Sequence, residues 1–261
     1  MRIATWNLNS VTARLPRLLQ WLEESEPDVL CVQETKVAGD KFPVAEVAAL
    51  GYEVAHHGQG RWNGVGIISR VGIADVVTDF AQSPGFPESD IKEARAIAAT
   101  CGPLRIWSLY VPNGRTPDDP HYRYKLEWLK ALSGTLAADV HGERPFAIVG
   151  DFNIAPTDDD VWDPAQFVDA THVTAPERGA LQQFLDLGLH DVFPRPLKGD
   201  HPYTYWDYRA GSFHKGWGMR IDLVYANTTL QKAVTDAYVD RDARKGKGPS
   251  DHAPVVVDAS L

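Results

Sequence analysis

Apolar residues in this chain gather in short runs that are bounded by Gly, Pro, Asn, Asp or Ser. Short apolar runs between turn residues are typical of buried strands. The predicted strands cover 2–6, 29–32, 52–56, 64–69, 73–78, 96–100, 104–111, 146–149, 220–225, 233–239 and 255–257. The pattern therefore predicts a fold rich in β-sheet from one end of the chain to the other.

Longer segments with apolar residues on one helical face separate these strands. Thr12 is expected to cap the first helix, because its hydroxyl can accept a hydrogen bond from a free backbone N–H. Thr174 and Glu177 have the spacing of a capping box. The predicted helices cover 12–25, 42–50, 121–138 and 174–187. Hairpins and long crossovers both occur, so we predict one α/β domain over 1–261 with mixed or antiparallel sheets.

Three segments combine turn residues with polar side chains, and we expect them to be irregular: 81–89, 203–217 and 241–249. The second is rich in aromatic residues, and the third is a basic connector with several glycines. Loops carry many of the binding and catalytic residues of proteins. The aromatic and basic loops are therefore candidates for contacts with a ligand.

The composition is that of an ordinary soluble globular protein, with 44% hydrophobic and 23% charged residues among 261. No apolar run approaches the length of a membrane span, and the first residues lead directly into a strand pattern. We therefore expect a cytoplasmic location. Cys31 and Cys101 lie in or beside apolar runs, which favours buried thiols over a disulfide.

The formal net charge of −9 argues, taken alone, against a polyanionic partner such as DNA. Net charge is a weak test, however, because local basic patches make the phosphate contacts. Bound divalent cations also reverse the sign of a site lined by carboxylates. The charge therefore leaves a nucleic-acid partner open.

The apolar run that ends at Val149 is followed by Gly150, Asp151 and Asn153. Gly150 allows a turn or a close approach, because it has no Cβ. In an extended chain, Asp151 and Asn153 point to the same face about 6.5–7 Å apart. That spacing suits a reacting group or a hard cation, although Asp and Asn are also common turn residues.

Other strand ends carry similar groups: Asn7, Glu34, Tyr110, Asp251 and His252. Carboxylate and amide oxygens suit Mg²⁺ or Mn²⁺. Asp222 lies inside an apolar strand, and a buried carboxylate needs a partner. A histidine is a natural partner, because an Asp–His pair orients the imidazole for water activation. Each residue alone has an ordinary structural interpretation, but the set together favours phosphate chemistry.

An ordered set of motifs between residues 5 and 254 resembles the exonuclease III family, the class II apurinic/apyrimidinic endonuclease branch of the deoxyribonuclease I-like phosphoesterases. The motifs are Trp6-Asn7-Leu8-Asn9, Gln33-Glu34-Thr35-Lys36, Tyr110-Val111-Pro112-Asn113-Gly114, Gly150-Asp151-Phe152-Asn153-Ile154-Ala155-Pro156-Thr157, Arg220-Ile221-Asp222 and Ser250-Asp251-His252-Ala253-Pro254. The resemblance implies a four-layer α/β sandwich, in which two face-to-face sheets are flanked by helices. It places the site at the strand ends, along one edge of the sandwich.

The resemblance also implies a role for each site residue. Glu34 would be the principal ligand of Mg²⁺ or Mn²⁺, and the remaining ligands of one or two metal positions would be Asn7, Asp151, Asn153, Asp251 and His252. Tyr110 would contact the scissile phosphate or assist the leaving group, and Asp222 would orient His252. Asp151 and His252 both remain candidates for the general base.

By the same resemblance, the protein would be a DNA phosphodiesterase of base-excision repair that acts as a monomer. It would cleave duplex DNA 5′ to abasic sites, trim blocked 3′ ends and degrade strands from their 3′ termini. Residues at positions that match DNA or abasic-site contacts are Asn113, Arg115, Tyr205, Trp217, Met219 and Ile221. Many relatives have Trp at the position of Tyr205, which leaves the balance of exonuclease and endonuclease activity open.

Phosphate contacts are expected from local bases, which are Lys36, Arg61, Arg95, Arg115, Arg123, Arg220 and the connector 241–247. Two alternatives remain at this stage. The same catalytic core occurs in phosphodiesterases that act on small or lipid phosphoesters, because fold does not determine substrate. A catalytically inactive DNA-binding protein could also use this fold, although it would not need to keep Glu34, Asp151, Asn153, Asp222 and His252 together.

Overall fold

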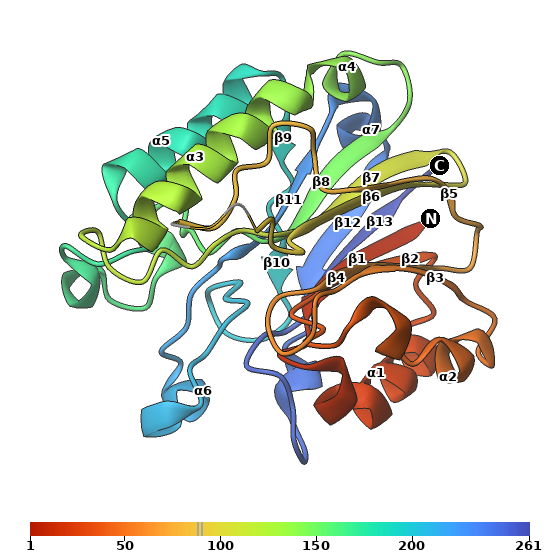
Figure 1. Cartoon of the computed structure of the whole chain (residues 1–261). Helices are drawn as coiled ribbons and strands as arrows, with labels where there is room; N and C mark the ends of the chain where they lie inside the picture. Colours follow the sequence, from red (N-terminus) through yellow and green to blue (C-terminus); the bar gives the residue numbers. More distant parts are fainter. Residues whose placement is uncertain (88, 90) are drawn as a thin grey trace.

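The computed structural model describes residues 1–87, 89 and 91–261. Residue 88 of the loop expected over 81–89 lies outside the described residues. Two mixed β-sheets, one of seven strands and one of six, lie face to face in the described part of the chain (Figure 1). Helices cover the outer face of each sheet. The predicted four-layer α/β sandwich is thereby confirmed.

The seven-stranded sheet has the order β10-β12-β13-β1-β2-β4-β3. Its strands are β1 (Arg2–Asn7), β2 (Val29–Gln33), β3 (Glu53–His57), β4 (Val65–Ser69), β10 (Arg195–Pro196), β12 (Val234–Val239) and β13 (Val255–Ala259). Strands β1 and β2 are parallel, whereas β1 and β13 are antiparallel. The first and last long strands of the chain therefore lie side by side at the centre of this sheet.

The six-stranded sheet has the order β5-β6-β7-β8-β11-β9. Its strands are β5 (Ala74–Thr78), β6 (Ala96–Cys101), β7 (Leu104–Tyr110), β8 (Phe146–Asp151), β9 (His190–Asp191) and β11 (Asp222–Ala226). Strand β8 pairs in parallel with β7 and antiparallel with β11. These two pairings bring three of the predicted site residues to one edge of the sheet.

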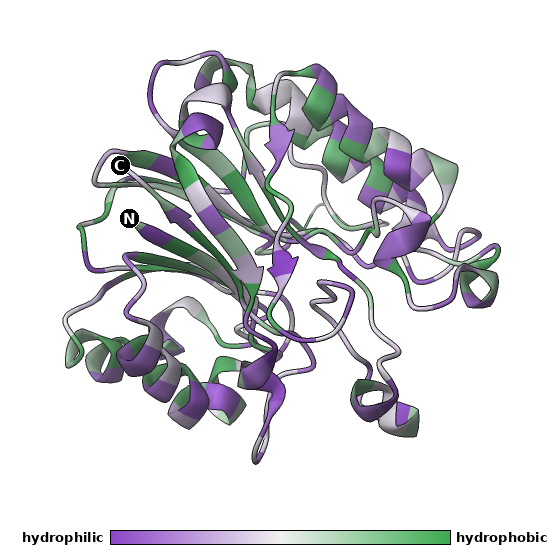
Figure 2. Ribbon diagram, turned by 180° about the vertical axis from the view of Figure 1, so that it is seen from behind, coloured by the Kyte–Doolittle hydropathy of each residue, from purple (hydrophilic) through white to green (hydrophobic). Residues whose placement is uncertain are grey.

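The core has three layers, because both faces of each sheet are covered. In β2, Val29 and Cys31 face the other sheet, whereas Leu30 and Val32 face the helices. A strand that is buried on both faces is apolar at successive positions, which explains why the continuous apolar runs of the sequence predicted these strands. In Figure 2 the strands are mostly hydrophobic and the helices carry both classes of residue. Cys31 and Cys101 are buried free thiols, as predicted.

Helices α1 (Val11–Ser25) and α2 (Val44–Ala48) lie on the seven-stranded sheet, and α3 (Pro120–Thr135) and α5 (Ala175–Asp186) lie side by side on the other (Figure 1). The remaining helical segments are short: α4 (Ala137–Val140), α6 (Ser212–Lys215), α7 (Thr228–Ala233), η1 (Gly39–Lys41), η2 (Asp158–Asp160), η3 (Pro164–Phe167), η4 (Arg209–Gly211) and η5 (Arg241–Arg244). None of the described helices has the length and apolar character needed to cross a membrane.

Several predicted boundaries differ from the structure. Ser10, not Thr12, caps α1 through a hydrogen bond from the Ala13 N–H to its Oγ. The helix begins at Val11, one residue before the predicted start. The backbone N–H of Ser10 donates to the carbonyl oxygen of Glu34 at 2.7 Å, which fixes the chain at this point. The predicted helix over 121–138 is divided into α3 and α4 at Leu136. The capping box of Thr174 and Glu177 is confirmed.

Two segments expected to be irregular contain short helices. Segment 203–217 holds η4 and α6, and the basic connector holds η5. Arg244 at the end of η5 is buried, and its guanidinium donates to the backbone oxygens of Trp206 and Ser250. The connector is therefore helical over η5 and is anchored to the loops beside it through Arg244, so the expectation of an irregular segment is wrong at 241–244.

Candidate active site

Strand register assembles the site. In the six-stranded sheet, Asp151 is paired with Tyr110 on one side and with Asp222 on the other. The ends of strands β7, β8 and β11 therefore carry three of the predicted site residues in a row. Two residues of the seven-stranded sheet face them: Asn7 ends β1, and Glu34 follows β2.

Gly150 explains how β8 can hold Asp151 next to β7. Its φ of 143° lies in the region that favours glycine. A Cβ on this residue would lie 2.0 Å from the carbonyl oxygen of Leu109 in the neighbouring strand. The close approach expected at Gly150 is therefore an approach to the backbone of β7.

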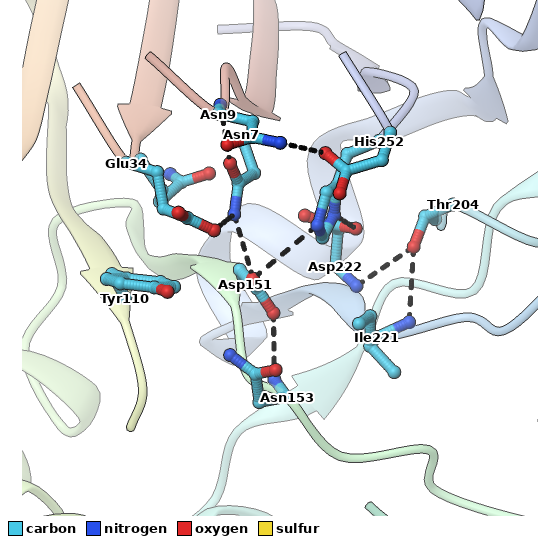
Figure 3. A network of polar contacts seen from close by, with 12 residues as sticks. Asn7, Asn9, Glu34, Tyr110, Asp151, Asn153, Thr204, Ile221, Asp222 and His252 are labelled. Atoms are coloured by element: carbon cyan, nitrogen blue, oxygen red, sulfur yellow. Dashed lines mark hydrogen bonds and ion pairs between the residues drawn. The ribbon is translucent and has the colours of Figure 1, made fainter. Parts of the chain in front are cut away.

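Asn7 links the two sheets at the centre of the site (Figure 3). Its Nδ2 donates to Oε1 of Glu34 and to Oδ2 of Asp151, at 2.9 Å in both cases. The other oxygen of Glu34 lies 2.8 Å from the ammonium of Lys36. Oδ1 of Asp151 accepts the backbone N–H of Asn153 at 2.9 Å. Both carboxylates are thus held in fixed orientations by neutral or cationic donors.

A second pair completes the row of polar side chains. Nδ1 of His252 lies 2.7 Å from Oδ2 of Asp222, and both residues are buried. Nε2 of the same ring lies 3.8 Å from Oδ2 of Asp151. Trp6 fixes the backbone at this point, because its indole N–H donates to the carbonyl oxygen of His252. The structure therefore contains the Asp–His arrangement expected from the sequence.

Burial and charge shift the pKa values of these groups in different directions. Burial, with the nearby carboxylates of Asp222 and Glu34, raises the pKa of Asp151 to about 7 despite the opposing effect of His252. Burial lowers the pKa of His252, but the carboxylate of Asp222 outweighs it and raises the value to about 10. Burial raises the pKa of Glu34, but the nearby ammonium of Lys36 lowers it more, so the pKa lies below its ordinary value. Burial raises the pKa of Tyr110. Shifts of this kind concentrate at functional sites.

Glu34, Asp151 and His252 each offer a ligand atom within 4.8 Å of the others. Two carboxylate oxygens and one imidazole nitrogen suit a hard divalent cation such as Mg²⁺ or Mn²⁺. The crowding of carboxylates that raises the pKa of Asp151 is also relieved by a cation. The residues present therefore fit a divalent metal.

The other predicted ligands lie around this group. Asp251 accepts a hydrogen bond from Nδ2 of Asn9 at 3.1 Å. The side-chain Nδ2 of Asn153 donates to the carbonyl oxygen of Val111, and its Oδ1 accepts from Nδ2 of Asn113. The amide nitrogen of Asn7 faces the two carboxylates, while its oxygen accepts the N–H of Asn9. In this arrangement, Asn7 serves as a hydrogen-bond donor to Glu34 and Asp151.

A cleft of about 500 Å³ opens beside these groups. It is lined by Tyr110, Asn113, Asp151, His252 and the predicted aromatic and apolar set Tyr205, Trp217, Met219 and Ile221. The ring of Tyr205 packs 4.9 Å from that of His252, and its backbone bridges both Met219 and His252. The structure thus brings the predicted DNA-contact residues to the same cleft, apart from Arg115, which is exposed and pairs with Asp119.

Six residues that were not selected from the sequence also line the cleft, namely Trp162, Phe167, His172, Asp207, Arg209 and Ser212. Trp162 stacks on Trp217, with ring centroids 4.7 Å apart and planes at 19°. His172 has a φ of 83°, and its Nδ1 is 2.6 Å from the carbonyl oxygen of Asn153. The segment around Trp162, Phe167 and His172 carries no distinctive motif, so only the folded chain reveals that it forms one wall of the cleft.

Three of the predicted phosphate contacts have internal partners instead. Arg220 is 2% exposed and pairs with Asp160 and Asp191. Arg95 is buried against Glu93. Lys36 is the partner of Glu34. Arg95 and Arg220 are buried cations, which in proteins are usually paired in this way, so they are not part of a basic surface. Lys36 is only half-buried.

A pair of facing sheets with carboxylates, amides and an Asp–His pair at one edge defines a phosphoester hydrolase. The chain belongs to the endonuclease/exonuclease/phosphatase family, whose model matches residues 4–252. This assignment rests on nearly the whole chain, and it agrees with the exonuclease III resemblance of the motifs.

Individual relatives narrow the class. The chain is 29% identical to exodeoxyribonuclease III of Haemophilus influenzae, with 98% of each chain covered. It is 35% identical to the 3′ phosphatase NExo of Neisseria bound to a product DNA hairpin, with a TM-score of 0.93 and 100% of each chain covered. It is also 35% identical to an AP endonuclease of Archaeoglobus fulgidus, with a TM-score of 0.91 and full coverage of both. The predicted exonuclease III family and the predicted function, a nuclease of DNA repair, are both confirmed.

Proposed function

We propose that this protein is a divalent-metal-dependent nuclease that cleaves duplex DNA at abasic sites and removes nucleotides or blocking groups from 3′ ends. The observation that carries the proposal is the convergence of Glu34, Asp151 and the Asp222–His252 pair on one cleft with aromatic walls. The named relatives include an exodeoxyribonuclease, a 3′ phosphatase and an AP endonuclease, which supports DNA as the substrate.

Glu34 and Asp151 would hold the cation, Mg²⁺ or Mn²⁺, and His252 beside them would stay protonated and so would not bind it. When bound, the cation supplies charge neutralisation at the phosphate oxygens. Asn7 holds both carboxylates through its amide nitrogen and so fixes the distance between them. Removal of either carboxylate would therefore affect both the charge and the geometry of the site.

His252 is oriented by Asp222 so that Nε2 faces the cleft. The nearby carboxylate favours the protonated imidazole, which would donate from Nε2 to a phosphate oxygen. Asp151 would then take the proton of the attacking water, since its carboxylate lines the same cleft 3.8 Å from Nε2 of His252. Tyr110, in the adjacent strand, would donate its hydroxyl hydrogen bond to the phosphate or the leaving oxygen.

The aromatic and apolar wall would receive the sugar at the lesion or at the 3′ end. Tyr205, Met219 and Ile221 form one side of the cleft, with Trp217 and Trp162 beyond them. A baseless sugar reaches such a cleft only after it leaves the helical stack. Asn113, which lines the cleft, and the exposed Arg115 would contact the flanking phosphates.

Two alternatives have less support. A phosphodiesterase of small or lipid phosphoesters has less support because the named relatives are DNA enzymes. An inactive DNA-binding protein would not need the buried Asp222–His252 pair or the three potential ligands. Both alternatives predict a protein that leaves duplex DNA uncut.

Three labelled duplexes test the proposal: one with a single abasic-site analogue, one with a 3′-phosphate and one undamaged. Each is incubated with protein in Mg²⁺, Mn²⁺ or EDTA, and the products are resolved by length. We expect metal-dependent incision 5′ to the lesion, loss of the 3′-phosphate and a ladder from the undamaged 3′ end. The relative rates give the order of the three activities. A folded protein that cuts none of them with either metal would contradict the proposal.

A further inference from the structure

Lys125 of α3 is a lysine whose side chain is completely buried. Its Nζ lies 2.5 Å from Oε1 of Glu177, whose side chain is also completely buried. The same ammonium donates to the carbonyl oxygen of Asn153 at 2.7 Å and to that of Asn113 at 3.1 Å. One buried cation therefore joins α3 and α5 to the loops that follow β7 and β8.

These two loops carry side chains that face the cleft. Asn113 and Asn153 both line it, and they are joined by a hydrogen bond of 3.1 Å from Nδ2 of Asn113 to Oδ1 of Asn153. Asn153 has a φ of 51°, in the left-handed region that Asn adopts more readily than most residues with a Cβ. The position of this turn is set by the hydrogen bonds that its backbone groups make. The ammonium of Lys125 supplies such a contact at the carbonyl of that residue.

Glu177 extends the same network to a third loop. Its Oε1 accepts from the hydroxyl of Thr171 at 2.7 Å and from the backbone N–H of His172 at 3.0 Å. The hydroxyl of Thr171 also lies 3.0 Å from the carbonyl oxygen of Asn113. The buried pair is therefore the shared partner of three loops, and each of them contributes a residue to the cleft.

Stability alone does not account for this pair. Removing two charges from water is costly, and apolar residues of similar size at such positions are often equally stabilising or more so. Apolar side chains could not bind the carbonyl oxygens of Asn113 and Asn153 or the N–H of His172. What the pair uniquely provides is a fixed position for the backbone of the three loops.

We propose that Lys125 and Glu177 form a positioning pair for the nuclease reaction, which sets the cleft-facing asparagines at their working distance from the phosphate. The proposal rests on the function proposed above. Neither residue lines the cleft, so both act through Asn113, Asn153 and the loop at His172. A displacement of about 1 Å at reacting groups is enough to cost on the order of 100-fold in rate.

The test is the double variant Lys125→Met/Glu177→Gln, in which both charges are removed and the single amide oxygen of the new side chain can accept either from the loop at Thr171 and His172 or from the helix cap at Thr174, but not from both. We expect kcat on the abasic duplex in Mg²⁺ to fall about 10- to 100-fold, with KM within about threefold because the exposed phosphate contacts remain. The melting temperature should fall, because the buried carbonyl oxygens of Asn113 and Asn153 lose the donor that Lys125 supplies. The control is Leu132→Ala, which leaves a cavity in the core under the same helix but keeps the Lys125–Glu177 pair. It should lower the melting temperature and leave kcat unchanged.

NMR signals of the Asn113 and Asn153 side-chain amides give a readout that does not depend on cleavage. They should shift in the double variant and stay in place in Leu132→Ala. Wild-type protein that cleaves no duplex would overturn the proposed function, whereas unmoved asparagine signals in the folded double variant would overturn the positioning role. So would a kcat within about twofold of wild type. Should the double variant not fold, Thr171→Val removes the hydroxyl that joins Glu177 to the carbonyl oxygen of Asn113. An Asn113 signal and a kcat that both keep their wild-type values there would overturn the role of Glu177 and with it that of the pair.

Discussion

The carboxylate of Asp222 holds the ring of His252 through a 2.7 Å contact at Nδ1, and Nε2 is left 3.8 Å from Asp151. The two residues come from different sheets: Asp222 begins β11, and His252 precedes β13. Their contact therefore depends on the face-to-face packing of the sandwich. It also fixes which ring nitrogen can reach a substrate.

Replacement of Asp222 by Asn tests this relationship. The amide keeps the shape of the side chain but removes the charge that favours the protonated imidazole, so we expect kcat to fall on the order of 100-fold. The measurement is single-turnover cleavage of the abasic duplex in Mg²⁺. Circular dichroism and Mn²⁺ affinity should remain near wild type. Full activity in a folded Asp222→Asn variant would show that His252 needs no carboxylate partner.

The strands were predictable because the signal is local. Strands buried on both faces are apolar at successive positions, and those runs are visible without any tertiary information. The candidate ligands were predictable for a related reason, since Glu34, Asp151 and His252 stand next to such strands within recognisable motifs. Strand ends and motif together were enough to bring these residues to one site.

The remaining features depend on contacts between distant segments. Lys125 has the sequence setting of an ordinary helix residue, yet it is buried because Glu177 of α5 lies opposite. Arg220 was expected on a phosphate-binding surface, but its acidic partners come from other parts of the fold. Trp162 stacks on Trp217, a residue far along the chain, where both line the cleft. No local pattern encodes such pairings.

Replacement of Glu34 by Gln should remove the cation site without changing the shape of the side chain. We expect Mg²⁺ at 100 times its Kd to stabilise the wild-type protein by about 2.7 kcal/mol and to have little effect on Glu34→Gln. The measurement is the melting temperature in Mg²⁺ and in EDTA, together with Mn²⁺ binding by electron paramagnetic resonance. Glu23→Gln, an exposed change of the same charge on α1, is the control and should behave as wild type. Equal stabilisation of Glu34→Gln would place the cation elsewhere.

Glu93 gives a prediction about pH and stability. Burial raises the pKa of this carboxyl, but the guanidinium of Arg95 outweighs it, so the pKa lies below the ordinary value. A carboxyl with a lowered native pKa stabilises the fold above its unfolded pKa, about 4.3, and loses that contribution as the pH falls through the native value. We therefore expect Glu93→Gln to cost about 2 kcal/mol at pH 7 and progressively less below about pH 4.

Urea unfolding of both proteins at a series of pH values from about 7 down to about 3 measures this difference. Glu127→Gln on the exposed side of α3 is the matched control and should show little difference at any of these pH values. A Glu93→Gln deficit that stays constant across the whole series would mean that the ionised carboxylate is not what stabilises Arg95. The carboxylate would then contribute packing alone.

Gly150 gives the sharpest prediction for the fold around the site. A methyl group there would meet the carbonyl oxygen of Leu109 at 2.0 Å, and that oxygen belongs to the paired strand β7 and cannot move freely. The φ of 143° adds backbone strain for any residue with a Cβ. We expect Gly150→Ala to lower the free energy of unfolding by on the order of 3 kcal/mol or more.

Gly179→Ala in α5 is the matched control, because a Cβ there meets nothing within 4 Å. It should instead stabilise the protein by about 0.5–1 kcal/mol. Urea unfolding of both variants decides the matter, and equal stability of the two would mean that β7 and β8 separate without cost.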